Sequence, residues 1–487
     1  MNRQLPYLAD LERAGIPTVL IDFGEETEKI KHDSLIFGVP GLRFVEASRT
    51  APGPEEAERI TKFVLSALTS PLTEEEKKGG RWASSEQRVL FEGTIEDAEE
   101  FYNQTEILPR IGNVPFAKYT DGLPIVIPTE ERVEKMLSGT SHKPDELIIL
   151  QRDVVPVEGG GMGRIRARDK GQVVKFMPLG RTATVEQVAV NAVMAGCKPE
   201  YFPVVLAIAE SGGGTGDGRG NGGGFVMSGP IYKEIGMNVS YGRFSPGFPA
   251  NKSIARVGSL LWRNLGGYKE SVTTIMTYGS PSTNGGFICA EYAEGLPPGW
   301  KGLNEELGFN KDESIIMPMA PGEGGIGQTW MPGIYRWCQN SGYGAMARYL
   351  EVEGTPGPHN WLPYLIEGLW AAREGGITIV MVPSMAKDLY DVGFKSKDEI
   401  YEWIWNQSFE TVKKYRLRGA PDYMTNGWRG IERTSGKPWK DLPGDYMVPA
   451  GGASPRANCI IIGAGEETSC QRFGGGHGSG YSIDAWR

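Results

Sequence analysis

Residues 11–21 read LERAGIPTVLI. The run 7–15 is typical of the end of a helix closed by Gly15, and 16–21 is typical of a buried strand. A second short strand is predicted over 42–47, and a helix with apolar residues at i, i+3 and i+4 spacing begins at Pro54. This alternation favours a parallel α/β layer. A doubly wound sheet normally begins with a strand and a ligand-binding turn, so we expect this N-terminal layer to be incomplete.

The polar stretch 70–90 carries a charge run and Gly-Gly, which is typical of a linker or an exposed insertion. We place the domain boundary there. The prediction is an α/β protein with a partial Rossmann-like domain over 1–80 and a larger α/β domain over 81–487, which is long enough to divide into two lobes.

The strongest helix pattern lies at 184–196, TVEQVAVNAVMAG, where Thr184 and Gln187 form a capping box and Gly196 suits the closing position. Pro199 suits the first turn of a following helix. Further elements are predicted in the larger region: a helix over 252–265, strands over 377–382 and 458–462, and a helix over 397–415.

The composition excludes several classes of protein. Among 487 residues, 40% are hydrophobic and 23% charged, and the net charge is −9, which argues against wholesale disorder and against a nucleic-acid partner. The 68 glycines, about twice the usual usage, indicate many tight turns. Five scattered cysteines without a C-x-x-C pair favour a reducing cytoplasm. No secretory signal or membrane span is visible, so a cytoplasmic location is expected.

Cys197 is the first candidate for chemistry. It lies at the start of the second predicted helix beside Lys198, and a helix N-terminus and an ammonium group both favour a thiolate. The alternative is a buried cysteine that acts as a small hydrophobe. Asp121, in the run TDGLPI over 120–125, could orient a substrate or act as a base, and the alternative is an ordinary Asp-Gly turn.

Two glycine-rich runs are less specific. The loop 212–224, GGGTGDGRGNGGG, could offer backbone N–H groups to an anion, but it lacks the ending of a nucleotide loop, and a flexible surface loop is the alternative. His477, in FGGGHGSG seven residues after Cys470, could serve a metal or act as a base, or could be an ordinary loop histidine. No metal or cofactor is predicted, since no known ligand or cofactor motif is present.

Five segments, in this order, carry a family resemblance: LERAGIPTVLI, TDGLPIVIPTEERVEKML, VAVNAVMAGCKPEYFPVVLA, SGPIYKEIGMN and LWRNLGG. They resemble the UGSC-type (seleno)protein family, whose members are often labelled thiol-disulfide isomerase-like and compared with selenoprotein B of glycine/betaine reductase. The family's N-terminal Gly-Ser-Cys segment does not appear in this chain. Its later G-H-P-G-K pattern stands here as GSPST over 279–283, and its acidic patch as EYAE over 291–294.

The resemblance implies an enzyme, or a large enzyme subunit, that performs cysteine-assisted bond cleavage or addition on a small polar metabolite, as a lyase, hydratase or thiol-dependent oxidoreductase. Cys197 would be nucleophile or proton donor, Lys198 would stabilise its thiolate, and Glu200 and Asp121 would be acid/base candidates. A partner chain could supply the missing strand and thiol, or the chain could form a homo-oligomer. The alternative is a noncatalytic assembly subunit of a thiol-bearing partner. The predicted substrate-binding residues are Asn191, Tyr201, Ser228, Asn238 and Asn251.

Overall fold

The structure is a computed structural model that describes parts of 8–73 and most of the chain from residue 88 onward. The described ranges from residue 88 onward are 88–108, 111–155, 167–212, 224–270, 273, 286–319, 376–417, 431–449, 454–466 and 469–487, apart from 433 and 475, with the backbone of 331–335. Residues 213–223 of the glycine-rich loop, the GSPST segment and most of the predicted linker over 70–90 lie outside these ranges.

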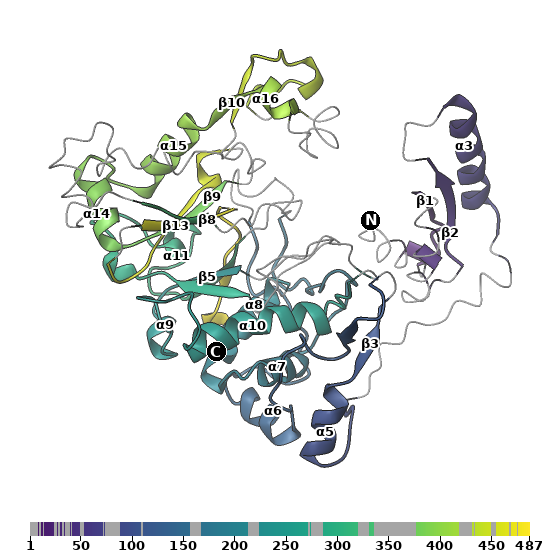
Figure 1. Cartoon of the computed structure of the whole chain (residues 1–487), viewed down its shortest axis with the longest axis horizontal. Helices are drawn as coiled ribbons and strands as arrows, with labels where there is room; N and C mark the ends of the chain where they lie inside the picture. The colour runs from purple at the N-terminus through teal and green to yellow at the C-terminus, as the bar shows by residue number, and fades with distance from the viewer. Residues whose placement is uncertain are drawn as a thin grey trace.

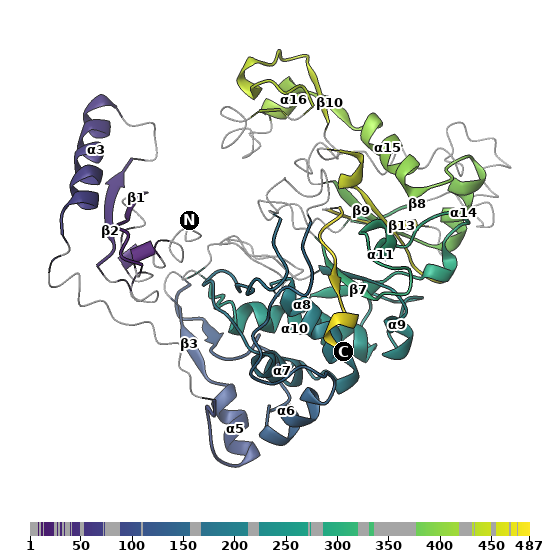
Figure 2. The same cartoon turned by 180° about the vertical axis from the view of Figure 1, so that it is seen from behind.

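The N-terminal layer contains two parallel strands, β1 (Val19–Phe23) and β2 (Arg43–Ala47), with helix α3 (Pro54–Thr69) beside them (Figures 1 and 2). β1 begins three residues later than predicted, and just before it the backbone N–H of Thr18 donates to the Glu12 side chain, at Oε1, at 2.5 Å instead of to a neighbouring strand. Within the described residues β1 pairs only with β2. The layer is therefore a small piece of parallel sheet covered by one helix.

The centre of the molecule is a helical layer packed on a sheet. It contains α7 (Val185–Met194), α8 (Phe202–Glu210) and α10 (Pro249–Asn264), whose buried faces form one core with the strands beneath them (Figure 1). The predicted capping box at Thr184 and the left-handed conformation of Gly196 are both confirmed. The second predicted helix begins as a 3-10 turn, Pro199–Tyr201, before α8. Four further elements come before α7: α5 (Ile95–Tyr102), the hairpin β3 (Thr105–Ile107) and β4 (Pro115–Ala117), and α6 (Glu130–Leu137).

Two four-stranded sheets complete the described core. The first has the order β14-β7-β5-β6 and contains Tyr481–Ser482, Ile315–Pro318, Gly224–Ser228 and Phe287–Ala290. The second has the order β12-β9-β13-β8 and contains Cys459–Ile462, Ile377–Met381, Ser469–Gly474 and Met331–Tyr335. In each sheet one pair is parallel, β5 with β6 and β12 with β9. The fold is thus a mixture of helices and small parallel or mixed sheets, α/β in the coarse sense.

The predicted helix over 397–415 is wrong as a single element. Helix α15 (Lys397–Gln407) ends before the short strand β10 (Phe409–Thr411), and a separate helix α16 (Val412–Leu417) follows. The break occurs because β10 pairs with β11 (Met447–Pro449), a tertiary contact that outweighs local helix preference.

No helix in the described part of the chain is long and apolar enough to cross a membrane. Short helical elements complete the list: α9 (Ile231–Glu234), α11 (Leu303–Glu306), α14 (Pro383–Asp391) and the 3-10 turns 293–295, 439–441, 455–457 and 484–486.

Candidate functional site

Helix α10 positions the residues nearest to Cys197. Its apolar side packs into the core, while Arg256 lies on its partly exposed side. Arg256 Nε and Nη2 donate to Asp121 Oδ2 and Oδ1, both at 2.8 Å, and Nη2 also donates to the carbonyl of Pro124 at 2.9 Å. This bidentate pair fixes the guanidinium plane and ties the segment after β4 to α10. Asp121 is thus the ion-pair partner of a helix arginine.

The thiol of Cys197 lies against the same helix. Burial raises the pKa of the Cys197 thiol to about 12, against the opposing effects of a hydrogen bond with Ser253 and the charge of Arg256. Ser253 Oγ donates to the carbonyl of Pro249 at 2.7 Å. Burial outweighs the hydrogen bond and the charge, and it favours the neutral form of the thiol. The thiolate expected at Cys197 is therefore wrong, and the group is a thiol at neutral pH.

Lys198 and Glu200 lie on the exposed side of the turn that follows Cys197. Their side chains are 61% and 52% exposed, and Lys198 Nζ lies 3.9 Å from Glu200 Oε1. Lys198 also lies over the ring of Tyr201, 5.9 Å from its centroid. The cation that acts on the thiol is Arg256, in place of the predicted Lys198. The acid/base role of Glu200 stays a prediction.

The remaining predicted residues fall into separate places. Asn191 is buried in α7 and accepts a hydrogen bond from Asn264 at 2.8 Å. Asn251 accepts from the backbone N–H of Asn238 and donates to its carbonyl, both at 2.9 Å, which holds the start of α10. Tyr201 is buried in the helical core. Ser228 lies at the end of β5, in the buried network described next.

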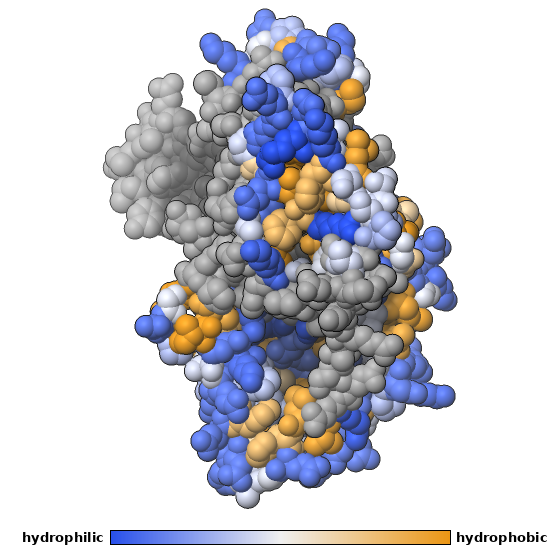
Figure 3. Space-filling view, turned by 90° about the vertical axis from the view of Figure 1, so that its right-hand side faces the viewer, coloured by the Kyte–Doolittle hydropathy of each residue, from blue (hydrophilic) through white to orange (hydrophobic). Residues whose placement is uncertain are grey.

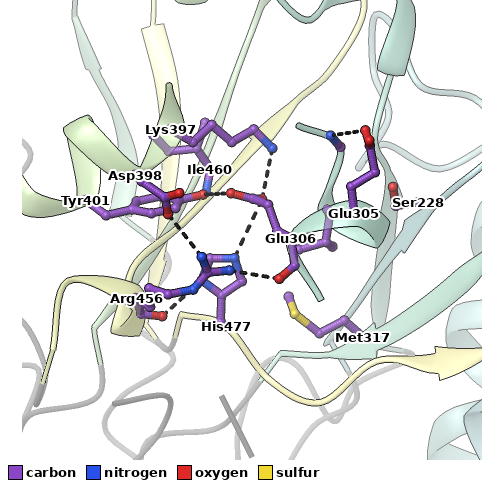
Figure 4. A network of polar contacts seen from close by, with 12 residues as sticks. Ser228, Glu305, Glu306, Met317, Lys397, Asp398, Tyr401, Arg456, Ile460 and His477 are labelled. Atoms are coloured by element: carbon purple, nitrogen blue, oxygen red, sulfur yellow. Dashed lines mark hydrogen bonds and ion pairs between the residues drawn. The ribbon is translucent and has the colours of Figure 1, made fainter. Parts of the chain in front are cut away.

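A second cluster of polar side chains is fully buried and connects the two four-stranded sheets (Figure 4). Lys397, the first residue of α15, donates to Glu291 Oε1 at 2.9 Å and to Glu306 Oε2 at 3.2 Å. Glu291 Oε2 also accepts from Ser228 Oγ at 2.9 Å and from the backbone N–H of Leu303 at 2.6 Å. Against the effect of burial, the two carboxylates raise the pKa of Lys397, so its ammonium is charged.

His477 completes this network. Its Nδ1 donates to the carbonyl of Arg456 at 3.0 Å, and its Nε2 lies 3.7 Å from Glu306 Oε2. Although burial opposes it, contacts with Cys459 and Glu306 raise the pKa of His477 to about 10. Tyr401 donates its hydroxyl to Glu306 Oε1 at 3.0 Å. His477 therefore lies in a loop, as the alternative reading expected, but it is buried there as a cation beside Cys459.

The charges of this network balance, with Lys397 and His477 against Glu291 and Glu306. None of the four side chains is more than 4% exposed. A buried, balanced set of ion pairs holds elements in register, because every group has a partner of opposite sign. The geometry therefore describes a structural junction between the sheets, and among the cysteines of the described ranges only Cys197 is not fully buried.

No family model, curated protein or solved structure matches this chain. Within the described ranges, no group of three or more His, Cys, Asp or Glu residues could hold a metal ion. The site is therefore defined by its own geometry: the thiol of Cys197, Ser253 and the Asp121–Arg256 pair.

Sequence reasoning missed the residues that α10 contributes. Ser253 and Arg256 lie within the predicted helix 252–265, and a polar residue and a charge beside its apolar stripe were the available signal. Nothing local pointed to Lys397, because its partners Glu291 and Glu306 are about a hundred residues away in sequence.

Proposed function

We propose that this chain is an enzyme, or the larger subunit of one, in which the Cys197 thiol acts as a proton donor in the cleavage of, or addition to, a small polar metabolite. Lyase or hydratase chemistry suits this role. The proposal includes a divergent relationship to the UGSC-type family, supported by the segments quoted above. The run NAVMAGCKPEY forms the end of α7, the turn with Cys197 and the 3-10 turn Pro199–Tyr201 that precedes α8.

One observation carries the proposal: Arg256 interacts with both groups. Its charge acts on the thiol of Cys197, and its guanidinium group donates two hydrogen bonds to Asp121. A thiol with a pKa of about 12 is protonated at neutral pH and can donate to a leaving group or a carbanion as negative charge develops there. Arg256 stabilises that charge, and Asp121 holds Arg256 in place and is thereby a positioning residue.

The first test measures the protonation state of the thiol. The intact protein is alkylated with iodoacetamide between pH 6 and pH 10.5, and the peptide that contains Cys197 is quantified by mass spectrometry. Because thiolate is the reactive form, we expect the rate to keep rising to the highest pH. Arg256→Gln should slow it further, since the cation that favours thiolate is removed. A plateau below pH 8 would overturn the proton-donor role.

The second test measures turnover. The wild type and Cys197→Ser are incubated with pooled small polar metabolites, and substrate loss and product formation are followed by mass spectrometry. We expect a loss of roughly 10²-fold or more in Cys197→Ser, the scale of one positioned proton donor. Cys470→Ser, at a buried thiol of β13, is the matched control for folding and should keep its activity. Equal turnover in the wild type and Cys197→Ser contradicts the proposal.

The alternative proposal is a noncatalytic assembly subunit. It is favoured by the N-terminal layer, where Ile16 and Ile21 are about half exposed and β1 has one described partner strand. Figure 3, with that side toward the viewer, has hydrophobic residues among hydrophilic ones in its upper half. A strand from a partner or a second copy would complete a doubly wound layer there. Light scattering on the purified chain, alone and with its genomic neighbours, tests this: a monomer in both cases refutes it.

A further inference from the structure

Arg263 lies on α10, seven residues after Arg256, and its guanidinium group is incompletely partnered. Nη2 donates to the carbonyl of Ala117 in β4, and the guanidinium carbon lies 4.3 Å from the centroid of the Phe116 ring. Its Nε is buried and has no hydrogen-bond partner in the described residues. The side chain is thus held in one orientation by a carbonyl and an aromatic ring, with a donor left over.

The neighbouring carboxylates are already paired with other cations. Asp121 forms the bidentate pair with Arg256, and Glu106 of β3 lies 2.7 Å from Lys269. In the described part of the chain, no carboxylate lies within ion-pair distance of Arg263. Three cations therefore share two carboxylates, and Arg263 is the excess charge.

This arrangement is costly for the protein by itself. Burial lowers the pKa of Arg263 to about 10, against the opposing charges of Asp121 and Glu106. A partly desolvated cation with an unused donor destabilises the folded state unless an anion joins it. The planar, forked guanidinium group is the side chain best suited to carboxylate and phosphate oxygens.

We propose that Arg263, oriented by Phe116 and Ala117, binds an oxyanion group of a ligand beside α10, next to the site formed by Cys197, Ser253 and the Asp121–Arg256 pair. The ligand is a small carboxylate or phosphate compound. Asp121 connects this site to Cys197, because its charge acts on Arg263 and its oxygens hold Arg256. Only the statement that this ligand is the substrate rests on the proposed function; the binding of an anion stands without it.

The test uses the whole chain and two kinds of probe, inorganic phosphate and the carboxylates acetate and succinate. Each is titrated at constant ionic strength against sodium chloride, and the melting temperature is recorded. We expect phosphate or a carboxylate to raise the melting temperature where chloride does not, and the more effective probe identifies the group. Bound anion should also slow the alkylation of Cys197, which needs no knowledge of the reaction.

Three variants decide the role of Arg263. Arg263→Gln should weaken anion binding about tenfold or more, as expected for a charged hydrogen bond, and Arg263→Lys should weaken it less. Arg152→Gln is the matched control, because Arg152 also lies over an aromatic ring but already has a carboxylate partner, Glu313. It should bind like the wild type. The Lys variant keeps the test valid if the Gln variant does not fold.

Two results would overturn the proposal: no stabilisation of the wild type by either probe, or equal stabilisation of the wild type and Arg263→Lys and Arg263→Gln. The proposed function fails separately. If anions stabilise the wild type through Arg263 while Cys197→Ser keeps full turnover, the anion site stands and the proton-donor role of Cys197 is wrong.

Discussion

Replacing Lys397 by Met would test the buried junction between the two sheets. The substitution keeps the apolar stem and removes the ammonium that bonds Glu291 at 2.9 Å and Glu306 at 3.2 Å. Removal of one partner from a buried ion pair typically costs about 3–5 kcal/mol, because the other charge stays buried without compensation. Against the effect of burial, Lys397 and His477 together lower the pKa of Glu306 from 4.5 to about 2, which corresponds to roughly 3 kcal/mol of favourable interaction at neutral pH shared between the two cations.

The pH dependence gives a second signature. The folded-state pKa of Glu306 is lowered, so the stability that Glu306 contributes is present above pH 4.5 and is lost as pH falls toward 2. In Lys397→Met the part of this contribution that Lys397 supplies is missing, and protonation of Glu306 relieves its excess charge. The difference in stability between wild type and variant should therefore shrink as pH falls from 7 to 4.

Urea denaturation followed by tryptophan fluorescence measures both effects. Lys387→Met is the control, since Lys387 pairs with Asp391 on an exposed helix surface and the variant should unfold close to the wild type. The double variant Lys397→Met/Glu306→Gln should recover part of the loss, because it removes one uncompensated charge. A loss below about 1 kcal/mol in Lys397→Met, on the scale of an exposed pair, would refute the argument.

Two other sites give further predictions. Glu210 accepts from the backbone N–H of Gln151 at 2.8 Å and from Trp486 Nε1 at 2.6 Å, and burial raises its pKa to about 7, against these bonds and the charge of Arg168. The stability that Glu210 contributes is complete below pH 4.5 and is lost as pH rises through 7. Glu210→Gln should therefore reduce the change of melting temperature with pH between pH 5 and 8. A variant whose melting temperature changes with pH as steeply as that of the wild type would count against this. At Gly476 an added Cβ would lie 1.4 Å from the carbonyl oxygen of Ala457, so Gly476→Ala should cost more than about 2 kcal/mol in urea denaturation, whereas Gly112→Ala, at φ +84° in open space, should cost about 1 kcal/mol. Equal effects of the two substitutions would contradict the packing argument.

Local pattern was sufficient for many of the elements. Helix α7 has its capping box at Thr184 because the cap depends only on residues three positions apart. Strands β9 and β12 coincide with their apolar runs to within one residue, because a buried strand must be apolar along its length. α10 follows its amphipathic stripe but begins earlier, at Pro249, since proline suits a first helical turn.

The local sequence pattern gave wrong predictions where contacts with residues distant in the chain determine the structure or the charge of a group. The helix predicted over 397–415 is interrupted because residues 409–411 pair with β11, and no local property of these residues indicates a strand. Cys197 has the neighbours that favour a thiolate, yet burial in the fold raises the pKa of its thiol to about 12. Sequence adjacency to Lys198 mattered less than spatial proximity to Arg256.

The sequence by itself determined several of the helices and strands, among them α7, β9 and β12, because capping, glycine turns and apolar spacing act over a few residues. Only the tertiary structure decided the electrostatics. It brought Lys397 to Glu291 and Glu306, His477 to Cys459, and Asp121 to Arg256. The physical reason is that a group's charge depends on its desolvation and on the charges around it in space, and the fold assembles both from segments that lie far apart in the chain.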